Sequence, residues 1–207
     1  MNDQTFSLKP FPSTKSLPNL KIAGNIARNY NQLSICYTLG GDLKEIALAL
    51  AQRLVEKPTV PLLLSKLPIA DAPSNKSLRK DELWKDTCFE FFLGIKDSQR
   101  YWEFNLSPTG YWNVYRFDGY RQGMQEETAF EKLPFSVQNQ ADSLALALDV
   151  DLDKIISAEQ EIELAITTVV KHRDGEVTYW ALTHQATEAD FHLRDSFIIK
   201  LLDLTWK

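Results

Sequence analysis

The chain has 207 residues, of which 44% are hydrophobic and 25% are charged, and its formal net charge is -5. This composition predicts a globular domain with a hydrophobic core, and the lack of a basic cluster disfavours nucleic acids and anionic membranes as partners. No apolar run is long enough to span a membrane, and the first residues lack the basic and apolar regions of a secretory signal. We therefore expect a cytoplasmic protein, and its oligomeric state stays open.

The two cysteines, Cys36 and Cys88, are far apart in the sequence. In a chain expected in a reducing compartment, they are predicted to be reduced thiols on strands rather than a disulfide. A structural zinc site would need histidine ligands beside them, and no histidine lies at ligand spacing from either cysteine. A zinc site is therefore not expected.

The first elements lie before residue 80. Residues 24–38 alternate apolar and polar positions around residues 29–31, which predicts a β-hairpin with its turn there. In residues 44–57, apolar residues recur every four positions, which fits an amphipathic helix. In the first half of this stretch they also recur every two positions, which fits a strand. We interpret them as a strand that gives way to a short helix or loop. Because residues 58–80 are rich in proline and polar residues, residues 45–80 are expected to form an elaboration outside the core.

The most informative stretch contains three predicted strands, residues 88–93, 101–106 and 111–117. Each alternates with period two and is rich in aromatic and β-branched residues, which is typical of antiparallel strands. Residues 107–110, with the sequence SPTG, join the second and third strands. Proline at the second position and glycine at the fourth fit a type I turn.

The same alternation assigns two faces to these strands. Phe89 and Phe91 are expected to point into the core, which puts Glu90 on the opposite face. That outward face would carry carboxylates, an amide and tyrosines: Glu90, Glu103, Asn105, Tyr101, Tyr111 and Tyr115. Such groups suit a sugar, whose hydroxyls need acceptors and whose C–H faces need flat apolar surfaces. The alternative is an ordinary solvated face with a cross-strand pair between Glu103 and Arg116.

The rest of the chain adds further strands. A loop is predicted over residues 119–134, strands over 143–150 and 161–170, a one-turn helix over 152–158, a hairpin partner over 176–184 and a closing strand over 197–204. About nine short strands with little helix predict an all-β fold, a two-sheet antiparallel β-sandwich of jelly-roll type. We expect one domain spanning residues 1–207.

Three sequence blocks support a resemblance to a known group of proteins. They are ELWKDTCFEFFL (82–93), YWEFNLSPTGYWNVYRFDGYRQGM (101–124) and DFHLRDSFIIKL (190–201). On these blocks the chain resembles the DOMON-like proteins, and most closely the type-nine carbohydrate-binding-module branch, which includes stand-alone bacterial members. The resemblance implies a two-sheet antiparallel sandwich. In the sugar-binding branch it also implies a ligand held between two aromatic side chains.

The resemblance also implies roles for individual residues. Trp84 matches one aromatic clamp, Glu90 an acidic contact and Asn105 a strand amide. Glu103 falls near a position that is basic in that branch, and the second clamp tryptophan is absent. The C-terminal block offers Phe191 and His192 there instead.

These observations predict a non-catalytic module that binds a carbohydrate or a similar small polar ligand. Its expected ligand surface consists of Trp84, Glu90, Glu103, Asn105 and Tyr115, with Arg116, Phe191, His192 and Arg194 at the rim. Trp84 has an alternative interpretation as a hydrophobic plug at the end of the sandwich, and Trp102, Trp112, Trp180 and Trp206 are expected in the core.

Several alternatives stay open. Other DOMON members bind haem b through methionine and histidine ligands, and Met124 with His184 or His192 would be the candidates here. A structural calcium ion is a further possibility, and so is a scaffold protein that binds no small ligand. Glu90 and Glu103 could act as the paired carboxylates of a glycosidase, although no motif of a known catalytic class is present.

His184, Asp190, His192 and Arg194 are close in the sequence and could meet at one loop. They could recognise ligand hydroxyls there, bind a metal ion or take part in acid-base chemistry, since histidine titrates near neutral pH. The alternative is a structural corner in which Arg194 pairs with Asp190 or Asp195.

Overall fold

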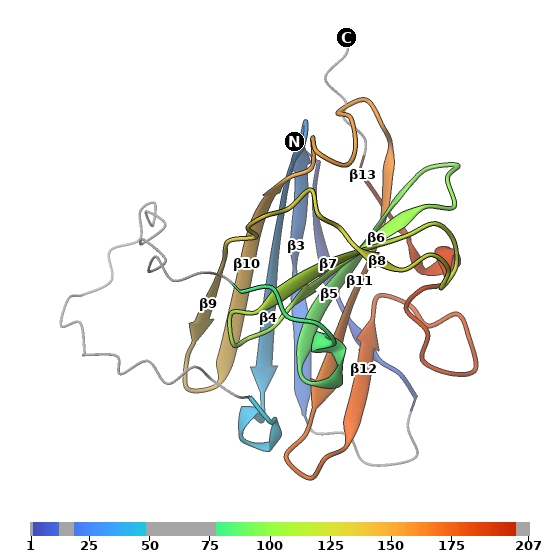
Figure 1. Ribbon diagram of the computed structural model, residues 1–207. Coiled ribbons are helices and arrows are strands. Elements are labelled where there is room, and N and C mark those ends of the chain that lie inside the picture. Colours follow the sequence, from blue (N-terminus) through green and yellow to red (C-terminus); the bar gives the residue numbers. More distant parts are fainter. Residues whose placement is uncertain (1, 13–18, 49–77, 202–207) are drawn as a thin grey trace, which may run out of the picture.

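The computed structural model describes residues 2–12, 19–48 and 78–201, and in it two antiparallel sheets pack face to face (Figure 1). The first sheet has the order β1-β3-β4-β10-β9, and the second has the order β2-β12-β11-β5-β6-β7-β8, with β13 also paired to β11. All strand pairs are antiparallel, which confirms the predicted all-β sandwich.

The strands of the first sheet are β1 (Asn2–Ser7), β3 (Leu20–Asn29), β4 (Gln32–Gly41), β9 (Phe135–Asn139) and β10 (Ser143–Asp151). Those of the second sheet are β2 (Lys9–Pro10), β5 (Cys88–Ile95), β6 (Tyr101–Leu106), β7 (Trp112–Phe117), β8 (Gln125–Glu126), β11 (Ile162–Lys171), β12 (Val177–Ala181) and β13 (Ile199–Leu201). Three short 3-10 helices connect them: η1 (Leu43–Glu45), η2 (Leu83–Lys85) and η3 (Arg194–Ser196).

The β3–β4 hairpin forms where the sequence predicts it. Its turn contains Tyr30, which adopts a positive φ of 54°. Along the strands, Gly24 lies so close to β4 that a Cβ atom there would be 1.8 Å from the carbonyl oxygen of Cys36. Only glycine allows this close approach, because the obstacle is the backbone of a paired strand rather than a movable side chain.

The main core fills the space between the two sheets. It takes the inward set of the central strands, including Phe91, Phe104 and Trp102, together with Tyr37 and Leu39 of the first sheet. Phe91 and Phe104 stack with their ring centroids 4.3 Å apart. The predicted direction of these side chains is therefore confirmed, and so are the buried positions of Trp102, Trp112 and Trp180.

Several elements differ from the sequence prediction. The short strands β1, β2, β8 and β9 were not predicted, and β8 lies inside the loop expected over residues 119–134. Short strands at the edge of a sheet carry little periodic signal. Residues 152–158 form a hydrogen-bonded turn rather than a helix. Ile46 forms an isolated bridge to His172 after η1, so the strand expected there is reduced to a single bridge within residues 44–48.

Some predictions lie outside the described residues. These are most of the elaboration at 45–80, the end of the closing strand at 202–204, and the core position of Trp206. In the described ranges no helix is long and apolar enough to cross a membrane. Both cysteines are free thiols, Cys88 buried and Cys36 half-buried.

The second sheet is covered on both of its faces. The face turned away from the first sheet, here called the outer face, carries a second hydrophobic cluster that includes Cys88, Phe92 and Tyr101. Leu83 and Phe197, which belong to the segments 79–87 and 190–197, pack onto this cluster. We call these segments the two covering segments. Because the core covers one face of β5 and these segments cover the other, seven of its eight residues are buried.

Candidate functional site

The outer face is buried rather than exposed, which corrects the expected ligand surface. Glu90 is 2% exposed, Glu103 5%, Asn105 0% and Tyr115 3%. The reason is that the same face carries large apolar side chains, such as Phe92 and Phe117, that have to be removed from water. Alternation placed the polar residues on the correct face, but it could not show that the chain covers that face.

The polar side chains of the outer face form a hydrogen-bonded network along neighbouring strands. Thr167 donates to Glu90 Oε2 at 3.2 Å, the Cys88 thiol donates to Asn105 Oδ1 at 3.4 Å, and Asn105 donates to Glu103 Oε1 at 2.8 Å. Glu90 Oε1 is buried without a hydrogen-bond partner. Burial, and next the charge of Glu103, raise the pKa of Glu90 well above its usual range.

Glu103 lies beside His192, with 4.0 Å between Oε2 and Nε2. Burial raises the pKa of Glu103 to about 7, although the Asn105 hydrogen bond and the charge of Arg121 act in the opposite direction. Burial, helped by the charge of Arg121, lowers the pKa of His192 to about 4. The other ring nitrogen of His192 hydrogen-bonds to the Tyr101 hydroxyl at 2.8 Å. Near pH 5.5 both members of the pair are therefore uncharged.

Among the remaining predicted residues, Trp84 is half-buried in η2 and meets Tyr115 edge-to-face, with the ring centroids 5.5 Å apart. Phe191 is 9% exposed and packs against Phe92 and Tyr179. Both aromatic residues therefore belong largely to the cover of the outer face. The half-burial of Trp84 agrees better with a hydrophobic residue that closes the end of the sandwich than with an exposed ring that binds a sugar.

Arg116 is not on the outer face. It lies opposite Trp102, whereas Glu103 lies opposite Tyr115, so the cross-strand pair between Glu103 and Arg116 does not form. The prediction that Arg116 belongs to the rim of this face is wrong, because neighbouring residues of a strand point to opposite sides of the sheet.

Arg194 and Asp190 do not pair with each other. Arg194 donates to Glu163 at 2.9 Å and to the carbonyl of Ile95 at 3.1 Å, and neither Asp190 nor Asp195 is its partner. Asp190 instead accepts hydrogen bonds from Arg121 and Tyr120. These contacts fasten the covering segment 190–197 to the sheet and to the loop after β7.

The other histidine and the internal methionine lie elsewhere. His184 hydrogen-bonds to the carbonyl of Lys9 at 2.9 Å, so it does not join His192 in one corner. Met124 is 47% exposed on the loop after β7. In the part of the chain that the structure describes, no group of three histidine, cysteine or acidic side chains could hold a metal ion.

An accessible pocket lies at the end of the second sheet where β5 begins and β6 ends. Its volume is about 580 Å³, and we call it the Tyr111 pocket. Its floor and walls carry Leu83, Thr87, Tyr111, Ala47, Leu48, Ser107, Pro108, Thr109, Lys80, Glu82, Asp86, Lys171 and Arg173. Tyr111 borders the pocket and is half-buried. Sequence reasoning placed Tyr111 on the polar face but did not find the other residues, which come from four separate segments.

The three cationic side chains of this pocket differ in whether they have a carboxylate partner. Lys171 pairs with Asp86 at 2.7 Å and also donates to the carbonyl of Lys85. The Lys80 ammonium lies 5.2 Å from the centroid of the Tyr111 ring. Among the described residues neither Lys80 nor Arg173 has a carboxylate partner. The pocket thus combines an aromatic ring, hydroxyl groups, carboxylates and two uncompensated cations.

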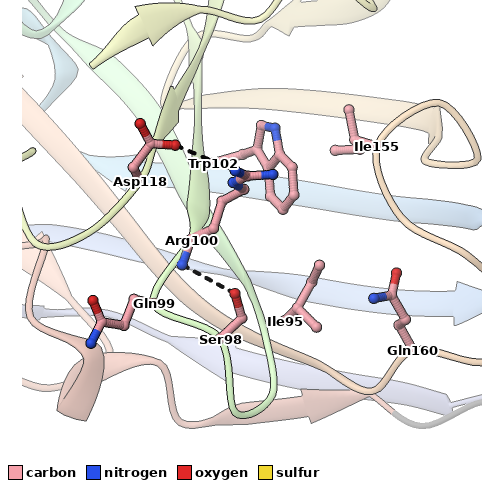
Figure 2. A pocket seen from close by; sticks show the side chains of 8 residues that line it. All are labelled: Ile95, Ser98, Gln99, Arg100, Trp102, Asp118, Ile155 and Gln160. Atoms are coloured by element: carbon pink, nitrogen blue, oxygen red, sulfur yellow. Dashed lines mark hydrogen bonds and ion pairs between the residues drawn. The ribbon is translucent and has the colours of Figure 1, made fainter. Parts of the chain in front are cut away.

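A second pocket, of about 480 Å³, lies at the opposite end of β6 (Figure 2). Trp102 borders it but is only 3% exposed, and its indole nitrogen already donates to Glu127. Figure 2 shows Arg100 joined to Asp118, and these groups are 3.5 Å apart. This pocket therefore offers a ligand neither an open ring nor an unpaired cation.

The comparisons with known proteins show the fold. No family model and no curated protein matches the sequence. A solved structure from Bacteroides uniformis ATCC 8492, of a protein proposed to bind carbohydrate, superposes with a TM-score of 0.64 at 10% identity. The match covers 94% of this chain and 84% of that chain. At this identity the likeness shows that both chains share a sandwich fold.

Proposed function

We propose that this protein is a non-catalytic binding module whose ligand is a saccharide or a similar small polar molecule, held in the Tyr111 pocket. The observation that carries the proposal is the half-buried Tyr111 side chain at the border of a pocket that hydroxyl and charged groups also line, among them Thr87 and Asp86. A sugar needs this combination, since its C–H face packs on a flat ring while its hydroxyls hydrogen-bond to polar side chains.

The fold supports the same proposal. The structurally similar protein from Bacteroides uniformis is itself proposed to bind carbohydrate, and its sandwich matches almost the whole of this chain. We infer that the chain is a divergent member of the DOMON-like group, near the type-nine carbohydrate-binding modules. Fold likeness alone does not establish a ligand, so the proposal depends on the pocket.

The buried carboxyl groups have a supporting role in this proposal. Glu90 and Glu103 are too deeply buried to touch a ligand in this conformation. The hydrogen bonds around them instead join β11 to β5, through Thr167 and Glu90, and β5 to β6, through Cys88 and Asn105. The expected ligand contacts are therefore moved from the centre of the outer face to its end.

Replacing Tyr111 with Ala is expected to weaken saccharide binding about fivefold, because an aromatic contact of this kind contributes on the order of 1 kcal/mol. The wild-type affinity itself is expected between about 10 µM and 1 mM, since each neutral hydrogen bond gains only about 1 kcal/mol over water. A glycan array identifies the ligand, and isothermal titration then compares the variants.

The matched control is Tyr30→Ala, which removes an exposed tyrosine from the β3–β4 turn. Tyr30→Ala should bind like the wild type. The proposal fails if no saccharide on the array binds, or if Tyr111→Ala binds as tightly as Tyr30→Ala.

A further inference from the structure

The Tyr111 pocket carries positive charge that the protein does not neutralise. In a chain of net charge -5, Lys80 meets Lys171 and Arg173 at one pocket although it lies far from them in the sequence. Only Lys171 has a carboxylate partner among the described residues, namely Asp86. Glu82, the other acidic residue of the lining, pairs instead with Lys85.

Lys80 and Arg173 are therefore free to bind an anion. Lys80 lies beside the Tyr111 ring, with its ammonium 5.2 Å from the ring centroid, so a group packed on that ring would come close to a positive charge. The backbone of Arg173 is fixed where β11 ends, because its N–H donates to the carbonyl of Glu45 at 2.8 Å. Charge-assisted hydrogen bonds from lysine and arginine to a carboxylate are about twice as strong as neutral ones.

We propose that the ligand of the Tyr111 pocket is an acidic saccharide, a sugar whose carboxylate pairs with Lys80 and Arg173 while its ring packs against Tyr111. This inference rests on the proposed function and makes it more specific. A uronic acid has the required form, since it differs from a neutral hexose by a carboxylate in place of the terminal CH₂OH group.

The test compares two ligands that differ only in that group, methyl β-D-glucuronide and methyl β-D-glucoside. The glucuronide is expected to bind the wild-type protein at least about tenfold more tightly at low ionic strength. The preference should shrink when the ionic strength is raised to about 0.5 M, because salt screens charges that are partly exposed. Isothermal titration measures both affinities.

Variants then test whether Lys80 and Arg173 are the residues that bind the carboxylate. Lys80→Gln and Arg173→Gln are each expected to lower the affinity for the glucuronide by a larger factor than the affinity for the glucoside, because only the glucuronide has a carboxylate to lose a cation. Arg100→Gln is the matched control, because Arg100 is an exposed arginine of the other pocket. It should change neither affinity.

The outcomes separate the two proposals. If both glycosides bind equally, the protein still binds saccharides and the acidic specificity is overturned. Equal binding of sodium acetate and the glucuronide would overturn it as well, because the sugar ring would then add nothing. Unchanged glucuronide affinity in Lys80→Gln and Arg173→Gln would place the anion elsewhere. Failure of every saccharide on the glycan array would overturn the proposed function itself.

Discussion

The free energy of unfolding of a Glu103→Gln variant is expected to rise by ~3 kcal/mol, relative to the wild type, as the pH increases from about 4 to 6.5. The reason is that folding raises the pKa of Glu103 and lowers the pKa of His192. Their pKa values in the folded protein are about 7 and about 4, against ordinary values of 4.5 and 6.5.

In the wild type the two effects cancel between pH 4.5 and 6.5. The unfolded pair carries one proton, on the histidine, and the folded pair also carries one proton, on Glu103. Because folding then neither takes up nor releases a proton at this pair, the pair gives stability no slope with pH. In Glu103→Gln only His192 still titrates. Because its pKa is lower in the folded protein, the unfolded state binds one more proton than the folded state between pH 4 and 6.5. The free energy of unfolding therefore falls as the pH falls.

A His192→Asn variant should show the opposite slope. The raised pKa of Glu103 contributes stability that is fully present below about pH 4.5 and lost as the pH rises towards about 7, by ~3 kcal/mol. Urea unfolding of the wild type, both single variants and the double variant across this range measures the slopes. The free energy of unfolding of the double variant should depend on pH in the same way as that of the wild type. Parallel profiles for Glu103→Gln and the wild type would show that the pair does not share a proton in this way.

Replacing Arg194 with Ala is expected to lower the free energy of unfolding by ~3 kcal/mol. The variant loses a charge-assisted hydrogen bond to Glu163 at 2.9 Å, a hydrogen bond to the carbonyl of Ile95, and a guanidinium–ring contact with Phe197 at 4.7 Å. These contacts hold the covering segment 190–197 over the outer face. Gly94 makes room for them, since a Cβ atom there would be 1.5 Å from Arg194 Nη1.

Lys200→Ala is the matched control for Arg194. Lys200 contacts the same carboxylate at 3.7 Å, but its side chain is 61% exposed, so its loss should change stability little. Gly94→Ala should be destabilising in the same direction as Arg194→Ala. Equal stabilities for Arg194→Ala and Lys200→Ala, measured by urea unfolding, would mean that Arg194 does not fasten the segment.

The sequence predicted the sandwich because its central strands carry a strong local signal. The alternation through Phe89, Phe91 and Phe104 specifies both strand identity and the side that faces the core. The same signal was misleading for Glu90. A strand buried on both faces is expected to read as a nearly continuous apolar run, and CFEFFLGI differs from such a run by one carboxyl group.

The cover of the outer face could not be predicted, because it depends on contacts between distant segments. The partner of Arg194 is Glu163 on β11, whereas sequence proximity favoured Asp190 and Asp195. The Tyr111 pocket is similar, since Lys80, Lys171 and Arg173 meet only after β5, β6 and β11 have paired. Lys171 and Arg173 are two positions apart, but no spacing in the sequence marks Lys80 as their neighbour.

Mapping the bound saccharide onto the protein tests the central claim most directly. Amide chemical shifts in ¹H–¹⁵N spectra, recorded while the tightest-binding saccharide is titrated, report which residues it meets. We expect the largest shifts at Thr87, Thr109 and Tyr111, whose side chains line the Tyr111 pocket. Shifts gathered instead at Arg100 and Gln160, around the pocket of Figure 2, would contradict the proposed site.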